Sequence, residues 1–391
     1  MARPLEGIRV LDLSRVLAGP FAGRMLCDLG ADVVKVEPPD GDMTRLWGAV
    51  IGGVPGYFHQ QNAGKRGMCI DLGRAEGVAI ARDLAQVADV VIENFRPGVL
   101  ARLGLGYETL KGLKEDVILL SISGFGQDGP ESGRAAYAAA IHAETGLVHR
   151  QGRDGREPAD IKMSVADTNA SLHGLVAVLS ALLMRARTGL GQHIDIAMVD
   201  AMLATDDQLQ YYLEDSHDTG PSVSDIWRTD VGSILTAGDF RHIWRQLNRR
   251  MGVADPTPAG AALADKIRLR RQAATKFFAS LASMEAVHDA MRRMNLAWGL
   301  VRDAKDARES PTVRHRGAII DADDRAGGTR PLTQSPYRFS AAESGVRGVA
   351  PHRGEHNAEV LRDWLKLDDV AVSKALASGA LLTETAASDA S

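Results

Sequence analysis

The first half of the chain alternates between short apolar runs and helix-like segments, and this alternation limits its fold more than any other feature. Runs rich in branched residues, typical of buried strands, occupy residues 8–14, 32–37, 89–94, 116–123 and 193–198. Helical spacing of apolar residues fills the intervals between them. Strands and helices in this order connect through right-handed crossovers into a mostly parallel sheet with helices on both faces. The sequence therefore predicts an α/β fold for this part of the chain.

A second, smaller domain is expected after a change in composition. Residues 214–224 are polar, contain Gly and Pro, and are typical of a linker. Residues 225–315 carry Arg-rich amphipathic segments, which predict an α-rich domain. Short strand-like pieces and one helix at 355–365 follow it. Before the linker, a helix over residues 167–187 is apolar nearly all round in its middle, so it is expected to be buried.

The composition argues against several functional classes. The chain of 391 residues is long for one core, and its formal net charge of -4 disfavours a nucleic-acid-binding protein. Its two cysteines, Cys27 and Cys69, lack CxxC or zinc-type spacing, so no metal site is expected. No signal-peptide pattern opens the chain, and its most apolar segment, 174–184, is shorter than the about 20 residues that span a bilayer. We expect a cytoplasmic protein that contacts neither nucleic acid nor membrane.

A glycine-rich segment at residues 124–129 follows a predicted strand and matches the GxGxxG pattern of dinucleotide-binding proteins. That fingerprint requires a helix that opens through the glycines. Here Pro130 follows at once, and Gly133 continues the loop. A loop at a strand end, of the kind that lines a ligand crevice, is the better interpretation, and a nicotinamide oxidoreductase is the weaker alternative.

Asp167 comes just before the apolar middle of the long helix and has two interpretations. It is a typical N-cap residue, because its carboxylate can accept hydrogen bonds from the first free N–H groups. A carboxylate at a helix N-terminus is also kept ionised by the helix dipole, and an ionised carboxylate can attack a thioester. Position alone favours the cap. His142 and His173 are candidate general bases, although a lone helical His is more often packed or solvated.

Five segments together resemble the family III (CaiB/BaiF-type) CoA-transferases. In chain order they read PLEGIRVLDLSRVLAGPFAGRMLCDLGADVVKVEPPDGDMTR, NAGKRGMCIDL, VVIENFRPGVLARLGLGYETL, SISGFGQDGP and VADTNASLHGLVAVLSALLMRARTGLGQHIDIAM. Their order and spacing match the family across residues 4–205, which is far more specific than any single short motif. The resemblance is thinner after residue 225.

The resemblance implies an architecture. It implies a Rossmann-like large domain that binds CoA, built from residues 1–213 and 320–391, with the small domain between these two segments. It also implies a homodimer whose two chains interlock like rings. It implies no permanently bound cofactor, because CoA and acyl-CoA are substrates.

The resemblance also implies a mechanism, because an Asp at the position of Asp167 is the family's nucleophile. Asp167 is then expected to attack an acyl-CoA thioester and form a mixed anhydride. The CoA thiolate attacks the aspartyl carbonyl, and the acceptor carboxylate attacks the resulting enzyme-CoA thioester, so that CoA passes to the new acyl group. Backbone N–H groups of residues 124–129 or of the helix start are candidates to stabilise the oxyanions.

The family's CoA contacts carry over onto matching positions of this chain. Arg102 matches a phosphate-binding Arg, and residues 134–137 match a stretch beside the CoA arm. The residues that the resemblance implies in CoA binding are Val16, Leu17, Ala18, Arg45, Lys65, Ile70, Asp71, Leu72, Gly73, Asn94, Phe95, Arg96, Arg102, Arg134, Ala135, Ala136 and Tyr137.

Two departures from the family pattern bear on the ligands. Pro38 stands where some members carry an Arg for the nucleotide phosphate, so Arg45 or Lys65 is expected to substitute for it. The Gly-rich loop of the formyl-CoA:oxalate enzymes is missing from the second half of the chain, so that substrate pair is not favoured. The expected donor is a short acyl-CoA or a dicarboxyl-CoA, and the expected acceptor is a small carboxylic acid.

Two alternatives on the same scaffold stay open. Tyr137 and Ala138 stand where the related α-methylacyl-CoA racemases carry a His-Asp pair. Racemisation needs an acid and a base on opposite faces of the α-carbon, so the missing His disfavours it, although His142 lies nearby in the sequence. The other alternative is a non-catalytic protein that binds acyl-CoA.

Overall fold

The computed structural model of the chain describes residues 1–152, 157–216 and 224–384. It divides the chain into two compact units. The large unit combines both chain ends, Met1–Asp207 and Arg314–Ser391, and the small unit is Gln208–Val313. The first segment of the large unit thus ends at Asp207, where residue 213 was predicted, and its second segment begins at Arg314, where residue 320 was predicted. Residues 217–223 of the predicted linker lie outside the described residues.

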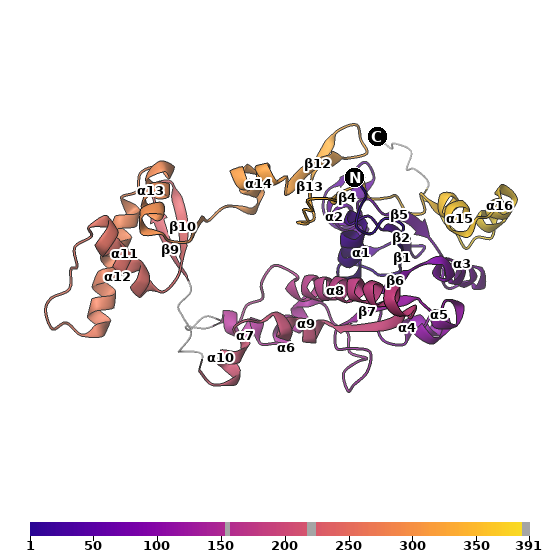
Figure 1. The fold of residues 1–391 in the computed structure, drawn as a ribbon, viewed down its shortest axis with the longest axis horizontal. Coiled ribbons are helices and arrows are strands. Elements are labelled where there is room, and N and C mark those ends of the chain that lie inside the picture. The colour runs from indigo at the N-terminus through magenta and orange to yellow at the C-terminus, as the bar shows by residue number, and fades with distance from the viewer. Residues whose placement is uncertain (153–156, 217–223, 385–391) are drawn as a thin grey trace. The chain divides into compact units, whose positions relative to one another are not determined.

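The large unit is built on a six-stranded sheet (Figure 1). In their order across the sheet, the strands are β5 (Arg66–Cys69), β2 (Asp32–Glu37), β1 (Arg9–Asp12), β6 (Val90–Glu93), β7 (Ile118–Ser123) and β8 (Gln192–Ala197). Every neighbouring pair is parallel. The predicted α/β class and parallel sheet are confirmed. Edge strand β5 was not predicted, because its sequence RGMC lacks the run of branched residues that marks the other strands.

Helices cover both faces of this sheet. They are α1 (Ala18–Asp28), α2 (Gly56–Asn62), α3 (Ala75–Val87), α4 (Val99–Arg102), α5 (Tyr107–Leu113), α6 (Ala138–Glu144), α7 (Leu147–Gln151), α8 (Val165–Thr188), α9 (Met198–Thr205), α15 (Asn357–Leu365) and α16 (Asp369–Ala377). Successive strand residues point to opposite faces. Val10 of β1 packs in the core with α1 and α8, whereas its neighbour Leu11 packs in the core with α3 and α15. The sheet is therefore buried on both sides, which explains its nearly continuous apolar strands.

Helix α8 is less buried than the sequence predicts. One side packs against α1, α9, β7 and β8. On the other side Leu172, Val176 and Leu183 are exposed by 43%, 61% and 55%. By length and composition α8 could cross a membrane, but a core helix passes the same test. The expected burial is therefore confirmed for one side of α8 only, because the described residues of the chain leave one apolar stripe of the helix exposed.

The small unit contains a sheet as well as helices. Its strands β9 (Ser224–Thr229), β10 (Gly232–Ala237) and β11 (Trp298–Leu300) pair antiparallel. Helices α11 (Phe240–Met251), α12 (Leu263–Ala279) and α13 (Met284–Met294) pack on a core that includes Trp227 and Phe278. The helical periodicity predicted an α-rich domain without resolving its separate helices, and the short strands were missed.

Short elements complete the description. They are the 3-10 helices η1 (Met43–Leu46) and η3 (Ala304–Glu309), the hairpins β3 (Val50–Ile51) with β4 (Val54–Pro55) and β12 (Ile319–Asp323) with β13 (Thr329–Thr333), and the helices α10 (Leu209–Leu213) and α14 (Pro311–Arg316).

Candidate active site

The winding of the sheet reverses beside β1, and this reversal creates a crevice. From β1 the chain builds outward through β2 and β5, and it then returns to the other side of β1 to build β6, β7 and β8. The loops that follow β1 and β6 therefore diverge at the carboxyl edge of the sheet. In open α/β sheets this switch point is where ligands bind. The sheet topology alone thus places a candidate site at the loops after Asp12 and Glu93.

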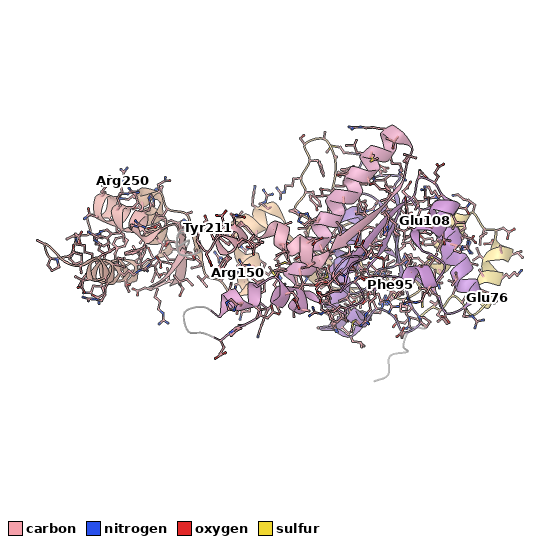
Figure 2. The ribbon with its side chains drawn as sticks, turned by 90° about the horizontal axis from the view of Figure 1, so that it is seen from below. Glu76, Phe95, Glu108, Arg150, Tyr211 and Arg250 are labelled. Carbon is pink, nitrogen blue, oxygen red and sulfur yellow. The ribbon has the colours of Figure 1, made fainter. Side chains whose placement is uncertain are left out.

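Two residues join these loops across the switch point. The backbone N–H of Arg15 donates to Oδ1 of Asn94 at 2.7 Å, and Nδ2 of Asn94 donates back to the Arg15 carbonyl at 2.7 Å. The Arg15 guanidinium lies 5.5 Å from the ring centroid of Phe95, which is labelled in Figure 2. These two hydrogen bonds fix the two loops relative to each other, and the Phe95 ring and the Arg15 guanidinium lie beside them.

Val16, next in the chain, has a strained backbone. Its φ of 66° lies in the left-handed region, which a β-branched residue rarely adopts and which costs about 1–3 kcal/mol. Its N–H donates to Oδ2 of Asp42 at 3.1 Å. That carboxylate is buried and lies 3.4 Å from the equally buried ammonium of Lys35. The buried ion pair therefore stabilises the turn at Val16, which leads into the start of α1 beside the crevice.

Asp167 lies at the meeting point of three helix N-termini. It is in the first turn of α8 and is 9% exposed. Its carboxylate accepts hydrogen bonds from the backbone N–H groups of Ala138 and Ala18, which are the first residues of α6 and α1. Burial raises the pKa of Asp167 to about 6, and these N–H groups and the nearby His142 oppose that rise. The carboxylate is thus ionised at neutral pH but poorly solvated, which suits a nucleophile.

The N-cap interpretation of Asp167 is wrong. The cap position of α8 is Ser164, three residues earlier, and the Ser164 side chain makes no cap hydrogen bond. Two of the N–H groups that donate hydrogen bonds to the Asp167 carboxylate belong to other helices, α6 and α1.

Two cavities adjoin Asp167, and a third adjoins one of these two. The switch-point cavity, of about 270 Å³, contains Asp167 and the loops after β1 and β6. The outer cavity, of about 300 Å³, shares Arg15 and Phe95 with it. The aromatic cavity, of about 450 Å³, also contains Asp167 and is named after its lining residues Trp47, Tyr57 and Tyr137. Asp167 therefore stands between two cavities, and the outer cavity continues one of them away from it.

Most of the residues expected to bind CoA line these cavities. Those in the switch-point cavity are Val16, Ala18, Asn94, Phe95, Arg96, Arg134, Ala135, Ala136 and Tyr137. Those in the outer cavity are Ile70, Asp71, Leu72, Gly73 and Phe95. Leu17 lines the aromatic cavity. Arg102 does not line a described cavity, but it is exposed on α4, whose first residue Val99 lines the outer cavity.

Lys65 and Arg45, two further residues expected to bind CoA, do not line the three cavities and form ion pairs within the fold. The Lys65 side chain is fully buried, and its ammonium lies 2.8 Å from Oδ2 of Asp12. Arg45 donates to both carboxylate oxygens of Glu37, at 2.7 Å and 2.6 Å, and to the carbonyl of Pro351. That one of them replaces the missing phosphate-binding Arg at Pro38 stays a prediction, and the ion pairs of both cations within the fold argue against it.

His142 is buried and both of its ring nitrogens are engaged. Its Nδ1 lies 2.8 Å from Oδ1 of Asp160, and its Nε2 accepts a hydrogen bond from the N–H of Ala166 at 3.2 Å. The ring therefore satisfies a free N–H at the start of α8 and is not a free base. This placement disfavours α-proton abstraction by His142. His173, the second candidate base, is not among the residues that line the three cavities.

The glycine-rich segment is a loop, as predicted. Gly126 and Gly129 have φ values of 87° and 89°, and no helix opens through residues 124–129. Gly124 lines the switch-point cavity beside Ser123. The dinucleotide fingerprint is therefore only a formal match.

The lining residues that were not predicted from the sequence include Arg15, Met43, Trp47, Tyr57 and Lys162. Arg15 follows a predicted strand, and this position was the one available signal. The others come from segments whose path could not be predicted. Tyr57 lines the aromatic cavity together with Asp167, and burial, together with the charges of Asp167 and Asp42, raises the pKa of its hydroxyl.

The chain is similar to known proteins along nearly all of its length. CoA-transferase family III matches residues 5–357. A succinate–glutarate CoA-transferase of Agrobacterium fabrum is 33% identical over 92% of this chain and 95% of its own. A succinyl-CoA–D-citramalate CoA-transferase of Chloroflexus aurantiacus is 33% identical over 95% and 97%. The crystal structure of a CaiB/BaiF family protein from Brucella suis superposes with a TM-score of 0.81 and 32% identity, covering 93% of this chain and 100% of that one.

Proposed function

Since the chain belongs to CoA-transferase family III and transfers CoA between carboxylic acids, we propose that it does so through a covalent intermediate on Asp167. One observation carries the proposal. Asp167 is a buried carboxylate between two cavities, and N–H groups from the starts of other helices point at it. It can therefore reach a thioester and also stabilise the charge that its attack creates.

CoA is proposed to lie along the two connected cavities that share Arg15 and Phe95. The nucleotide occupies the outer cavity at residues 70–73, and the pantetheine arm passes Phe95 toward Asp167. Arginines near this path supply the positive charge that phosphates require. They are Arg15, Arg96, Arg102 and Arg134.

In the first half-reaction, CoA passes from the donor acyl group to the carboxyl group of Asp167. One of its oxygens attacks the thioester carbon of the donor, the C–S bond breaks, and a mixed anhydride and CoA thiolate form. The thiolate then attacks the aspartyl carbonyl carbon, the anhydride C–O bond breaks, and the donor leaves as a carboxylate. The N–H groups of Ala18 and Ala138 are placed to stabilise the oxyanion at the aspartyl carbon.

The second half-reaction reverses these steps with the acceptor. The acceptor carboxylate attacks the aspartyl-CoA thioester, which gives a new mixed anhydride and releases the thiolate. The thiolate attacks the acyl carbon of the acceptor, so that acceptor-CoA forms and the Asp167 carboxylate is regenerated. No proton has to be moved in either half, which agrees with a site where the nearby His142 is already hydrogen-bonded.

The proposed substrates are short dicarboxylic acids and their CoA thioesters. The names of the two relatives specify succinate or succinyl-CoA together with glutarate or D-citramalate. The aromatic cavity, of about 450 Å³, has room for such an acyl group.

The proposed assembly is an interlocked homodimer in the cytoplasm, with no permanently bound cofactor. The exposed apolar stripe of α8 supports an association, because isolated apolar patches of this kind mark interfaces. The stripe consists of Leu172, Val176 and Leu183.

Covalent trapping tests the mechanism. The protein is incubated with a panel of acyl-CoAs and then with hydroxylamine or borohydride, and peptides are analysed by mass spectrometry. The expected result is a stable mass change on the peptide with Asp167, seen with selected donors and absent from Asp167→Asn. Asp83→Asn, which alters an exposed carboxylate on α3 outside the three cavities, is the matched control and keeps the label. Binding of CoA without any label, from every donor, would overturn the covalent mechanism.

A further inference from the structure

The aromatic cavity has a single cationic side chain among its lining residues, Lys162. We propose that Lys162 binds the distal carboxylate of a dicarboxylic acyl group while the thioester carbon of that group reacts at Asp167. Lys162 would then select dicarboxylic substrates over monocarboxylic ones of equal length. This inference rests on the proposed function and extends it to a residue that determines specificity.

The positions of the cavities separate the two ends of an acyl-CoA. The switch-point and aromatic cavities share Val16, Met43, Tyr137 and Asp167. With CoA along the switch-point and outer cavities, the thioester carbon lies at this shared boundary. The acyl chain must then continue into the aromatic cavity, where Lys162 is.

The charge of Lys162 is not neutralised by another part of the described chain. The Lys162 side chain is exposed, and no carboxylate of the described residues lies within 4.0 Å of its ammonium. The two acids that line the aromatic cavity, Asp160 and Asp167, have other partners. Asp160 pairs with His142, and Asp167 accepts hydrogen bonds from backbone N–H groups. An incoming carboxylate is the partner that this cation lacks.

The remaining walls suit the methylene groups of a short chain. Trp47 and Tyr57 pack edge to face with ring centroids 5.2 Å apart, and Met43 and Tyr137 lie on the side shared with the switch-point cavity. Apolar walls with a small number of polar groups at defined positions are how small-ligand sites obtain orientation. The apolar walls favour any short acyl group, but only a dicarboxylic one gains a charge-assisted hydrogen bond to Lys162.

The backbone around Lys162 is anchored on both sides. Before it, Asp160 is held by His142 at 2.8 Å. After it, the N–H of Val165 donates to the carbonyl of Met163 at 2.9 Å, and the N–H of Ala166 donates to His142. The chain from Lys162 to Asp167 is therefore a short hydrogen-bonded turn followed by the start of α8, which keeps the backbone of Lys162 close to the nucleophile while its exposed side chain can adjust to a ligand.

The test compares succinyl-CoA with butyryl-CoA, which has the same chain length and no distal carboxylate. Lys162→Met is expected to lower kcat/KM for succinyl-CoA about tenfold, mainly through KM, and to leave butyryl-CoA within about twofold. Lys162→Arg restores most of the loss. Lys111→Met, which alters an exposed lysine on α5, is the matched control and changes neither substrate.

A second measurement separates this inference from the aspartyl mechanism. Equilibrium binding of both thioesters to Asp167→Asn requires no chemistry, and the preference for succinyl-CoA over butyryl-CoA must fall when Lys162→Met is added. An unchanged preference in binding and turnover overturns the role of Lys162, even where Asp167 is still labelled. A lost preference in binding together with an unlabelled wild-type Asp167 supports Lys162 and overturns the covalent mechanism.

Discussion

Lys65 and Asp12 form an ion pair in which neither side chain is exposed to solvent, with Nζ 2.8 Å from Oδ2. The ammonium also donates to the carbonyl of Pro20 at 2.8 Å and to Oδ1 of Asn62 at 2.9 Å. Asp12 is the last residue of β1 and Pro20 lies in α1, so the pair fastens the strand and the helix that flank the switch point. The ion pair thus connects these two elements beneath the site, and its buried ammonium has no solvent-exposed surface at which to meet a phosphate.

Lys65→Met is therefore expected to destabilise the protein, because it leaves the Asp12 carboxylate buried without a counter-ion. The free energy of unfolding should fall by about 3–5 kcal/mol, measured by chemical denaturation. Arg102→Met, at an exposed position on α4, is the comparison. It should change stability by less than about 0.5 kcal/mol and weaken CoA binding in calorimetry. A stable Lys65→Met protein with weak CoA binding would return Lys65 to the phosphate site.

The ionisation of Asp167 should give both activity and stability a pH dependence. Burial raises the pKa of Asp167 from 3.8 to about 6, and attack requires the carboxylate. Labelling of Asp167 at saturating donor should thus rise with pH through about 6 and level off above pH 7. Rapid-quench mass spectrometry across pH 5–8 measures this rate. A flat profile over that range would contradict the raised pKa.

The same pKa predicts that Asp167→Asn stabilises the protein at neutral pH. The folded state holds the Asp167 proton more tightly than the unfolded state does, so this contribution is full below about pH 4 and is lost as pH rises through about 6. The advantage of Asp167→Asn over wild type should grow over that interval by up to about 3 kcal/mol. Denaturation of both proteins at pH 4.5 and pH 7.5 measures the difference. A constant difference would show that burial does not disfavour the charged form.

The sequence predicted the sheet and much of the site because both depend on local signals. The β-branched runs identified five of the six strands, and the crossover rule then made the sheet parallel. Loops after strands were predictable ligand positions, and Asn94 and Phe95 do lie there. The role of Asp167 came from family resemblance, since its position in the sequence favoured a cap.

What the sequence could not predict depends on contacts between distant segments. Asp167 receives N–H groups from α1 and α6, more than 25 residues away, and no periodicity encodes this meeting. Lysine is usually a surface residue, and the burial of Lys65 depends on the counter-ion Asp12, which lies 53 positions away in sequence. The stripe on α8 is apolar like a core, but nothing in its periodicity tells whether the same chain covers it.

His142 should behave as a structural residue and not as an acid–base catalyst. Its replacement by Ala leaves the Ala166 N–H without its acceptor, so the free energy of unfolding should fall by about 1–3 kcal/mol. His149→Ala, at an exposed position on α7, should have little effect. With a 2-methylacyl-CoA in D₂O, the wild-type protein should introduce no deuterium at the α-carbon, as followed by NMR. Deuterium uptake that His142→Ala abolishes would instead support the racemase alternative.

Val176 is the most exposed residue of the α8 stripe, and its replacement by Asp should disrupt the proposed dimer. A carboxylate in the middle of an apolar interface loses its hydration without gaining a partner, which disfavours association by several kcal/mol. Analytical ultracentrifugation should show dimers for wild type and monomers for Val176→Asp. Val370→Asp makes the same change on α16 at a valine that is 79% exposed, and it should stay dimeric. Unchanged dimers of Val176→Asp would mean that a different surface holds the two chains together.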